Sequence, residues 1–258
     1  MGKKGSSRHS KRLSAPIPYP IKRKHGVFTI KPYPTRGKAE SSIPLGIIMR
    51  EILGYAKTLS EIKKILVRKV VKIDGKVRTN YKFGVGPMDV IEISPTDEFY
   101  RLTPYRGRRR LKLQPISKEE ANTKILRVQR KRTIRNNQIQ LTFHDGGNYL
   151  IDPEEESKIP INEISPKDSV LFNLESKEIE QHIPFAEGNI GLIMGGHNVG
   201  IVGKIQDIET QTGKNIRIIT LEMEEGEIKT TDNHIFIIGD KKPLIEIPTT
   251  DGEKEDES

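Results

Sequence analysis

Hydrophobic positions from residue 43 onward first follow a helical repeat. Apolar residues recur three and four positions apart, the spacing of one helix face, at Leu45, Ile48, Met49, Ile52 and Leu53. Pro44 suits the first helical position, and Gly54 is a good residue for a helix end. The pattern therefore predicts a short amphipathic helix that ends near Gly54.

A second short helix is predicted to begin at Thr58. Thr58 and Glu61 have the spacing of a capping box, which satisfies free N–H groups at a helix start. The apolar stripe that follows consists of Ile62, Ile65, Leu66 and Val70. Residues four apart share a helix face, so we expect Lys64 and Arg68 together on the solvent side with Lys63 beside them.

The next segment, residues 71–79, has the pattern of a β-hairpin centred on Asp74-Gly75. A two-residue turn would pair Lys72 with Val77 and mix apolar and basic side chains on both faces. A three-residue loop, residues 73–75 with Gly75 left-handed, pairs Val71 with Val77 instead. We therefore predict the three-residue loop.

That register also pairs Lys72 with Lys76. It would gather Lys72, Lys76 and Arg78 on one outer face, where they could join Lys64 and Arg68 in a single positive patch. Residues 89–93, DVIEI, alternate in the same way and are expected to complete the small sheet.

Strand patterns dominate the rest of the chain. Residues 138–143 and the turn at 144–147 indicate a β-rich central domain that ends near residue 172. Six short strands follow at regular spacing: residues 169–174, 178–183, 189–194, 200–209, 215–223 and 234–239. This spacing predicts a small C-terminal β-barrel.

The two ends of the chain look different from the body. Residues 1–42 hold 11 Lys and Arg, one acid and several prolines, which favours an extended basic arm. Its few apolar and aromatic residues could fix it to RNA or to the body, although composition alone also allows a solvated tail. Residues 241–258 hold six acids and three lysines and are predicted to be a disordered tail.

Charge is strongly polarised along the chain. Residues 1–135 hold 34 Lys and Arg against 10 Asp and Glu, a formal charge of +24. Residues 136–258 hold 10 against 25, a formal charge of −15. Cationic side chains gain affinity for nucleic acid by displacing counterions from phosphates. The first half is therefore expected to bind a polyanion, and the acidic half to face away from most of it.

Several classes of protein are excluded by composition. The chain has no cysteine, which rules out disulfides, Cys-ligated metals and thiol nucleophiles. No segment approaches the apolar length of a membrane span. The glycines at 195, 196, 200 and 203 match neither a P-loop nor a dinucleotide motif, and we expect turns with positive φ there.

Catalytic and metal chemistry also find no support. The six histidines have no metal-ligand spacing, and His144-Asp145 has no nucleophile motif nearby. The acidic groups at 154–156 and at 224, 225 and 227 lack the alternating ligands of a calcium loop. We expect no catalytic residue, metal, cofactor or small-molecule substrate.

The candidate RNA contacts lie in three basic segments. The third, residues 101–135, holds 13 Lys and Arg against two acids, and it could form an exposed strand pair or a phosphate-contacting loop. The candidates are Lys3, Lys4, Arg8, Lys11, Arg12, Lys22, Arg23 and Lys24 in the arm, Lys63, Lys64, Arg68, Lys72, Lys76 and Arg78 in the helices and hairpin, and Arg106, Arg108, Arg109 and Arg110.

The order of these parts resembles a known family. The motifs HSKRLSAP, GVF, SIPL, KIDGKVRT, MDVI, GNIGLIMGGHNVGIVGKI and HIFIIG are similar to those of the archaeal and eukaryotic small-subunit ribosomal protein S4e family. The resemblance covers residues 1 to about 240. The acidic end of the chain is closer to archaeal members.

This resemblance implies a fold and a function. The helices and hairpin resemble the S4 RNA-binding module, and the glycine segment resembles a KOW motif, which opens a barrel like the Src-homology-three domain. The basic residue usual before the KOW glycine is Val199 here, so the resemblance does not imply RNA contact by that loop. We expect a non-catalytic constituent of the cytoplasmic small ribosomal subunit, with ribosomal RNA and neighbouring ribosomal proteins as its partners.

The expected architecture is multidomain α+β. It comprises a basic extension (1–42), an S4-type module (43–106), a central β-rich domain (107–172), a KOW barrel (173–240) and an acidic tail (241–258). Two alternatives stay open. One is an RNA-modifying enzyme of the pseudouridine synthase kind, although the Arg-Leu-Asp stretch of those enzymes is absent. The other is a free transcription or translation factor whose barrel binds a protein.

Overall fold

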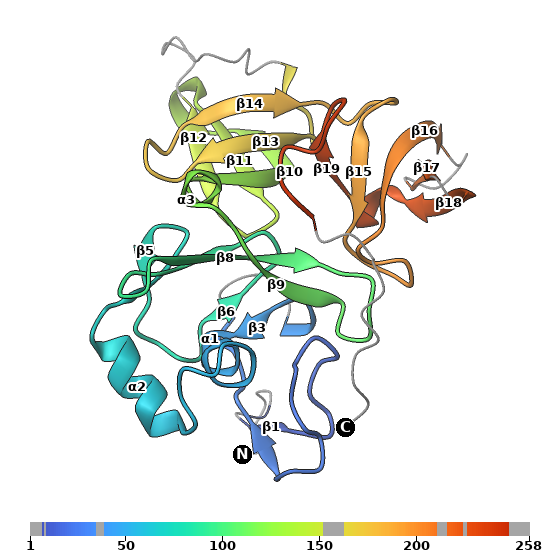
Figure 1. Cartoon of the computed structure of the whole chain (residues 1–258). Helices are drawn as coiled ribbons and strands as arrows, with labels where there is room; N and C mark the ends of the chain where they lie inside the picture. Colours follow the sequence, from blue (N-terminus) through green and yellow to red (C-terminus); the bar gives the residue numbers. More distant parts are fainter. Residues whose placement is uncertain are drawn as a thin grey trace, which may run out of the picture.

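The computed structural model describes residues 7, 9–34, 39–151, 163–210, 216–223 and 226–247. The chain folds into three five-stranded sheets with short helices and small two-stranded ladders. In Figure 1 the N-terminal segment and the helices between residues 45 and 67 lie below the first sheet, and the other two sheets lie side by side above it. The fold is α+β, with far more strand than helix.

The first predicted helix is shorter and more irregular than its pattern indicates. One α-helical turn, α1 (Leu45–Ile47), continues into a π-helical turn, η2 (Ile48–Ile52), in which the Leu53 N–H donates to the Ile48 carbonyl across 2.9 Å. Residues 45–49 are all buried, so this segment is enclosed on every side and has no solvent face there. The predicted short helix therefore forms and ends before Gly54, but its first five residues are not amphipathic.

The second helix forms as predicted. Helix α2 (Leu59–Val67) begins at Thr58, whose side chain accepts from the Glu61 N–H, while the Glu61 carboxylate accepts from the Thr58 N–H. Such a cap stabilises a helix by about 1 kcal/mol. Ile62 and Leu66 are fully buried against the first sheet's core, which fixes the polar face outward.

The first sheet has the order β5-β4-β7-β8-β9, with all neighbours antiparallel. Its strands are β4 (Val71–Ile73), β5 (Lys76–Val77), β7 (Val90–Ile93), β8 (Glu98–Pro104) and β9 (Leu111–Pro115). A short ladder between β3 (Ile43–Pro44) and β6 (Gly84–Val85) lies beside it. The strand predicted at 89–93 is confirmed, and the boundary predicted at residue 106 lies in the loop between β8 and β9.

The predicted register of the β4–β5 hairpin was wrong. Lys72 lies opposite Val77 and Ile73 opposite Lys76, so the turn has two central residues. Asp74 and Gly75 have φ of 49° and 70°, as a type I′ turn requires.

Contacts far along the chain explain this turn. One oxygen of the Asp74 carboxylate accepts from the Val90 N–H (3.0 Å), and the other accepts from the Lys124 ammonium (2.8 Å). These bonds hold Asp74 in the turn and so favour the two-residue register. The prediction relied only on separating polar from apolar side chains, and this preference is weaker.

The N-terminal segment packs onto the body. Strands β1 (Ser10–Lys11) and β2 (Phe28–Thr29) pair, and Tyr19, Ile21 and Ile30 are buried within the same core as α2. These apolar and aromatic residues therefore fix the segment to the body, which was one of the two possibilities left open by the sequence. Residues 9–34 are neither a free arm nor a solvated tail.

The central sheet has the order β12-β11-β10-β13-β14. After the short helix α3 (Lys118–Ala121) come β10 (Thr123–Thr133), β11 (Ile139–Phe143) and β12 (Asn148–Ile151), and then β13 (Ser169–Asn173) and β14 (Ile179–Ile183). The 3₁₀ turn η3 (Arg135–Asn137) joins β10 to β11. The hydrophobic core of the central sheet includes Leu126, Val128, Leu141 and Phe143.

The C-terminal sheet has the order β18-β17-β16-β15-β19. Its strands are β15 (Ile190–Ile193), β16 (Val202–Thr210), β17 (Arg217–Met223), β18 (Gly226–Thr231) and β19 (Ile235–Gly239), which follows the 3₁₀ turn η5 (Asp232–His234). The first two of the six strands predicted for one barrel are β13 and β14, which pair with the central sheet. That part of the prediction was wrong, because strand patterns do not specify pairing partners.

The C-terminal end of the described chain is also better ordered than predicted. Ile245 is buried beside Phe236 and Ile238, and Leu244 donates its N–H to the Ile238 carbonyl across 2.9 Å. Residues 241–247 therefore belong to the folded body and not to a disordered tail. The remainder of the predicted tail, residues 248–258, lies outside the described residues.

Candidate nucleic-acid interface

Helix α2 presents one group of candidate residues. Lys63, Lys64 and Arg68 are all exposed, because the buried stripe of Ile62 and Leu66 turns them to solvent. The Lys63 ammonium lies 5.4 Å from the centre of the Tyr81 ring. The predicted solvent face of this helix is confirmed.

The hairpin does not present its cations on one face. Lys76 and Arg78 lie on the same side of β5 and its continuation, whereas Lys72 shares the opposite face with Val77. The Lys72 ammonium forms an ion pair with the Glu92 carboxylate at 2.7 Å, and the Arg78 guanidinium lies 4.3 Å from the centre of the Phe83 ring. The predicted single patch is thus divided by the register.

The hairpin loop between β8 and β9 gathers the third group. Residues 105–110 connect the two strands, and the Tyr105 N–H donates to the Arg110 carbonyl across 3.0 Å. Arg106, Arg108, Arg109 and Arg110 are all exposed, and none has a carboxylate within ion-pair distance in the described part of the chain. The first part of the basic segment therefore combines the two predicted forms: a strand pair, β8 and β9, with an exposed basic loop at its tip.

The connection between β15 and β16 supports this loop through a glycine. Gly200 has φ of +86°, and a Cβ atom there would overlap the backbone of Tyr105 and Arg106. Gly196 also has positive φ, at +85°. The other two glycines of the segment differ from the prediction: Gly195 and Gly203 do not have positive φ, and close contact with His234 and with the Glu222 carbonyl excludes a side chain instead.

The N-terminal candidates divide into exposed and structural groups. Lys11, Lys22 and Lys24 are exposed. Arg23 donates to the carbonyls of Ala15 and of Pro16, the latter at 2.9 Å, and so holds the N-terminal loop closed. Arg12 is half-buried and lies 3.8 Å from the Glu51 carboxylate. Lys3, Lys4 and Arg8 lie outside the described residues.

Some basic residues of the first half are interior groups. Arg101 is 1% exposed and donates to the carbonyls of Glu120 and Thr123 at 2.8 and 2.9 Å. Burial lowers the pKa of this guanidinium. Arg127 donates to the Ile235 carbonyl at 2.8 Å and so joins the central and C-terminal sheets. A count of Lys and Arg therefore overstates the surface available to RNA.

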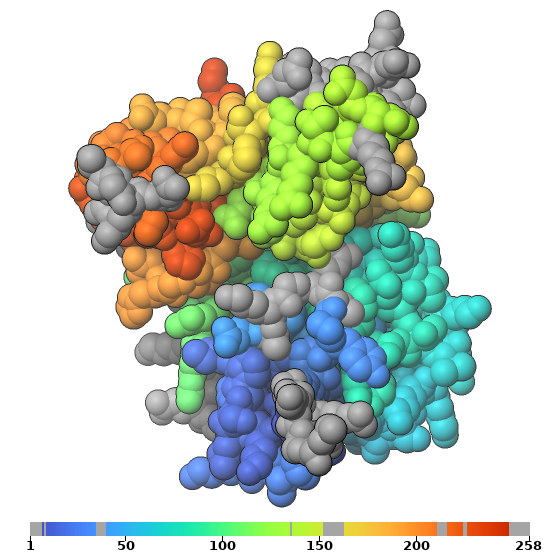
Figure 2. Space-filling model, turned by 180° about the vertical axis from the view of Figure 1, so that it is seen from behind, coloured from blue at the N-terminus to red at the C-terminus, as the bar shows by residue number. Residues whose placement is uncertain are grey.

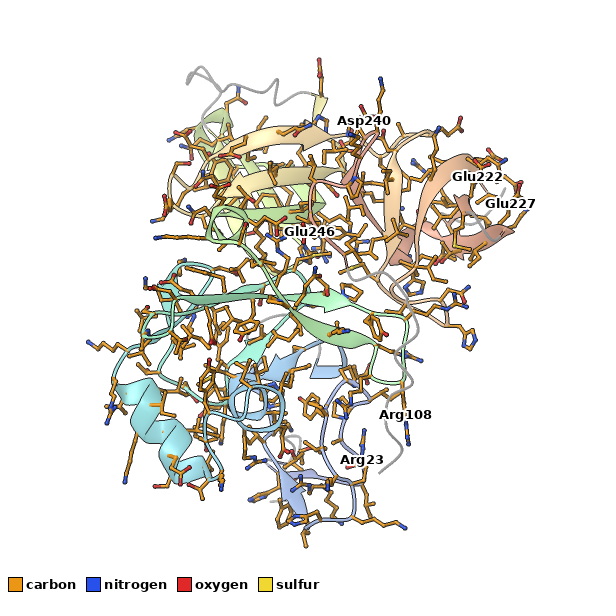
Figure 3. The ribbon with its side chains drawn as sticks, in the orientation of Figure 1. Arg23, Arg108, Glu222, Glu227, Asp240 and Glu246 are labelled. Atoms are coloured by element: carbon orange, nitrogen blue, oxygen red, sulfur yellow. The ribbon has the colours of Figure 1, made fainter. Side chains whose placement is uncertain are left out.

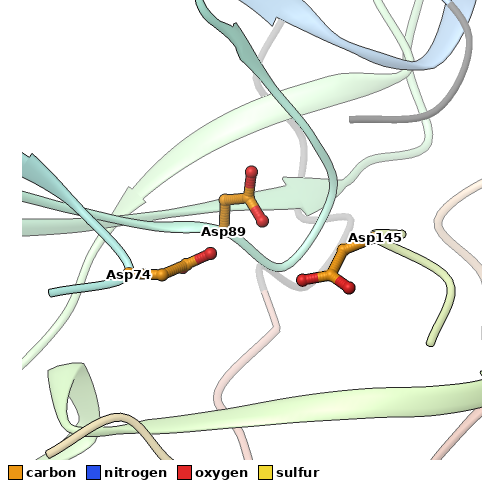
Figure 4. A group of neighbouring side chains, drawn as sticks. All are labelled: Asp74, Asp89 and Asp145. Carbon is orange, nitrogen blue, oxygen red and sulfur yellow. The ribbon is translucent and has the colours of Figure 1, made fainter. Parts of the chain in front are cut away.

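A third interior cation, Lys124, occupies a cluster of three carboxylates that has the spacing of a metal site. Asp74, Asp89 and Asp145 place ligand atoms within 4.8 Å of one another (Figure 4). The Lys124 ammonium lies 2.8, 2.5 and 3.3 Å from their oxygens. The cluster is filled by a cation of the chain itself and ties the first sheet to the turn between β11 and β12.

His144 is a neutral packing group. Burial lowers its pKa to about 3, and the charges of Lys124 and Arg127 act in the same direction. Its Nδ1 atom accepts from the Arg127 N–H at 3.2 Å, and its ring packs edge-on against Phe236. The acidic groups weighed at 154–156, 224 and 225 lie outside the described residues.

Opposite charges are separated in space as well as in sequence. Arg23 and Arg108 lie on the N-terminal part of the molecule, whereas Glu222 and Glu227 lie on the far end of the C-terminal sheet (Figure 3). On that sheet the Lys229 ammonium lies 3.8 Å from the Glu209 carboxylate. No helix among the described residues is long and apolar enough to cross a membrane.

A capped helix, a β-hairpin and an exposed basic loop on one small sheet define a protein with an RNA-binding module of the S4 type, and residues 51–91 match the S4 domain model. Two further family models match: the RS4NT (NUC023) domain at residues 4–34, and ribosomal family S4e at residues 96–179.

Relatives match over nearly the whole chain. Small ribosomal subunit protein eS4 of Hyperthermus butylicus is 42% identical over 257 residues, covering 96% of this chain and 98% of the relative. The protein of the same name from Ignicoccus hospitalis is 39% identical over 246 residues, covering 95% and 96%. The chain belongs to the ribosomal protein S4e family, whose members are structural ribosomal proteins and not enzymes.

A solved structure is also similar. The crystal structure of the 30S ribosomal protein S4e from Thermoplasma acidophilum superimposes with a TM-score of 0.61 at 33% identity, covering 77% of this chain and 95% of that one. The resemblance inferred from the sequence motifs is confirmed, and the alternative of an RNA-modifying enzyme is excluded.

Proposed function

We propose that this protein is a constituent of the small ribosomal subunit that binds ribosomal RNA through basic surfaces of its N-terminal half and supports subunit assembly and translation in the cytoplasm. The observation that carries the proposal is the exposed loop of Arg106, Arg108, Arg109 and Arg110, which has no carboxylate partner among the described residues. Exposed guanidinium groups suit the phosphates of folded RNA.

Helix α2 and the β4–β5 hairpin supply a second group of exposed cations, on the other side of the first sheet from the arginine loop (Figures 1 and 3). Lys64 and Arg68 are exposed and have no hydrogen-bond or ion-pair partner among the described residues, and Lys76 lies at the exposed tip of the hairpin. Lys11, Lys22 and Lys24 add charge at the N-terminal end. Lys72, Arg12 and Arg23 contribute less in this proposal, because each already has a partner within the protein.

In this proposal the domains have different partners or roles. Residues 1–42 and 43–106 meet ribosomal RNA together with Arg108, Arg109 and Arg110 at the start of residues 107–172, and the rest of 107–172 connects them to the C-terminal part. The C-terminal sheet corresponds to the KOW, Src-homology-three-like unit. Its acidic surface faces away from most of the RNA and toward neighbouring ribosomal proteins.

Salt dependence of binding tests the RNA surface. The variant R108Q/R109Q should bind small-subunit ribosomal RNA more weakly, and the slope of log affinity against log salt should fall by about 0.7 to 0.9 per lost phosphate contact. The control K204Q/K229Q removes the same charge from the C-terminal sheet and should leave the slope unchanged. An unaltered slope for R108Q/R109Q would contradict the proposal.

Sedimentation of native lysate tests membership of the subunit. The protein should migrate with small subunits in stoichiometric amount after a high-salt wash. Release by that wash would favour the remaining alternative, a free transcription or translation factor.

A further inference from the structure

Strand β10 changes its register halfway along, and this exposes two arginines. The β10–β11 pairing shifts between Val128 and Arg130, which is a β-bulge. Beyond the bulge Lys131 lies opposite Leu141, which is fully buried. Since successive side chains alternate between faces, Arg130 and Arg132 point away from the core on either side of Lys131.

The outer face of this part of the sheet contains no carboxylate among the described residues. The pairing registers place its side chains in two rows across three strands, which are Arg130, Thr142 and Asn148, and Arg132, Gln140 and Leu150. The Thr142 hydroxyl donates to the Asn148 side-chain oxygen at 2.8 Å. Hydroxyl and amide groups beside Arg are the side chains that contact phosphates and sugars in nucleic-acid complexes.

The two guanidinium groups are available for a partner. Arg130 and Arg132 are exposed, and neither has a hydrogen bond or ion pair within the part of the chain that the structure describes. Two residues apart on a strand, they stand about 6.6 Å from each other along it. Lys131, between them, donates to the Ile164 carbonyl on the other face at 2.9 Å.

The exposed face of the C-terminal sheet differs, because its cations lie beside carboxylates. There the Lys229 ammonium lies 3.8 Å from the Glu209 carboxylate, and Lys204 lies opposite Glu222. The C-terminal sheet therefore has an exposed face with mixed charges. The outer face of β10–β12 has cations and no acids among the described residues.

The cationic face of β10–β12 lies on the same side of the molecule as helix α2. In Figure 1 β11 and β12 lie behind β13 and β14, and Figure 2, seen from behind, shows the yellow-green surface of these strands on the same side of the molecule as the cyan and teal surface of α2 and the hairpin. A folded RNA that meets α2 on this side can extend onto the central sheet.

We infer that the outer face of β10–β12, centred on Arg130 and Arg132, is a second and separate RNA-binding surface that contacts the phosphate backbone. This inference rests on the proposed binding of ribosomal RNA and extends it to a domain that the basic N-terminal module does not include. Recognition here uses charge and hydrogen bonds to backbone groups, so it carries no base specificity.

The test uses the full chain and small-subunit ribosomal RNA. In R130Q/R132Q the slope of log affinity against log salt should fall by about 0.7 to 0.9 for each lost phosphate contact. R130K/R132K keeps the charge and should retain the wild-type slope, and K204Q/K229Q controls for net charge. A wild-type slope for R130Q/R132Q, with the fold intact by circular dichroism, overturns the inference.

Nucleotide protection separates this surface from the N-terminal one. R130Q/R132Q should lose protection at a set of nucleotides different from the set lost in K64Q/R68Q. If K64Q/R68Q changes neither slope nor protection while R130Q/R132Q changes both, the proposed contact by α2 fails and this one stands. If only K64Q/R68Q changes them, the central sheet has no RNA contact and faces another partner, such as an acidic protein.

Discussion

The backbone of Gly200 lies directly against the backbone of Arg106, at a place where no side chain could fit. The first residue belongs to the C-terminal part of the chain, and the second lies in the basic loop between β8 and β9. The acidic half of the protein therefore has a structural role in the basic half, because it forms the wall against which the arginine loop rests.

Substitution of Gly200 by Ala should destabilise the protein markedly. A non-glycine residue at φ of +86° is strained by about 1 to 2 kcal/mol, and its Cβ would also force the Arg106 loop away. Thermal unfolding measures the effect. Gly188, with φ of +91° and open space around its Cβ position, is the matched control. G188A should show the backbone strain alone, and equal losses in the two variants would refute the packing role of Gly200.

Substitution of Lys124 by Met should cost about 3 to 5 kcal/mol of folding free energy, because it leaves buried carboxylates without their cation. Urea unfolding at neutral pH measures this loss. The double variant K124M/D89N removes one of the charges and should recover part of the stability. A K124M protein as stable as the wild type would show that the ion cluster contributes nothing to the junction.

The neutral state of His144 predicts a pH dependence of stability. Its pKa is about 3 when folded, against an ordinary value near 6.5, so the unfolded chain binds a proton that the folded one does not. The contribution of His144 is fully present above pH ~6.5 and is lost as pH falls, by about 1.4 kcal/mol per pH unit, until the folded pKa is reached.

Unfolding of wild type and H144Q at pH 7 and pH 5 tests this. The wild type should lose about 2 kcal/mol more than the variant over that interval, because Gln carries no proton to bind. Parallel losses in the two proteins would mean that the imidazole is protonated within the fold.

Local patterns in the sequence were enough for several elements. The Thr58 capping box, the stripe of α2 and the strand at 89–93 depend on neighbours within a few residues, and each is confirmed. Strands β15, β16, β17 and β19 are likewise found where alternation and turn residues place them, whereas β18 (Gly226–Thr231) was not predicted.

The errors come from contacts between distant residues. Asp74 determines the hairpin register through partners 16 and 50 residues away, and no pattern near the turn reports them. The pairing of β13 with β10 likewise removes two strands from the predicted barrel. Charge counting fails for a related reason, since Arg101 and Lys124 are buried by contacts that composition does not contain.

The burial of Tyr19, Ile21 and Ile30 has a consequence for assembly of the ribosome. A tail that folds only on contact with RNA must lose its conformational entropy at that moment, which weakens binding and makes it dependent on a coupled folding step. Here residues 9–34 are ordered before any partner arrives. In the proposed function, this segment can therefore meet its RNA partner as a preformed part, without a folding step of its own that is coupled to binding.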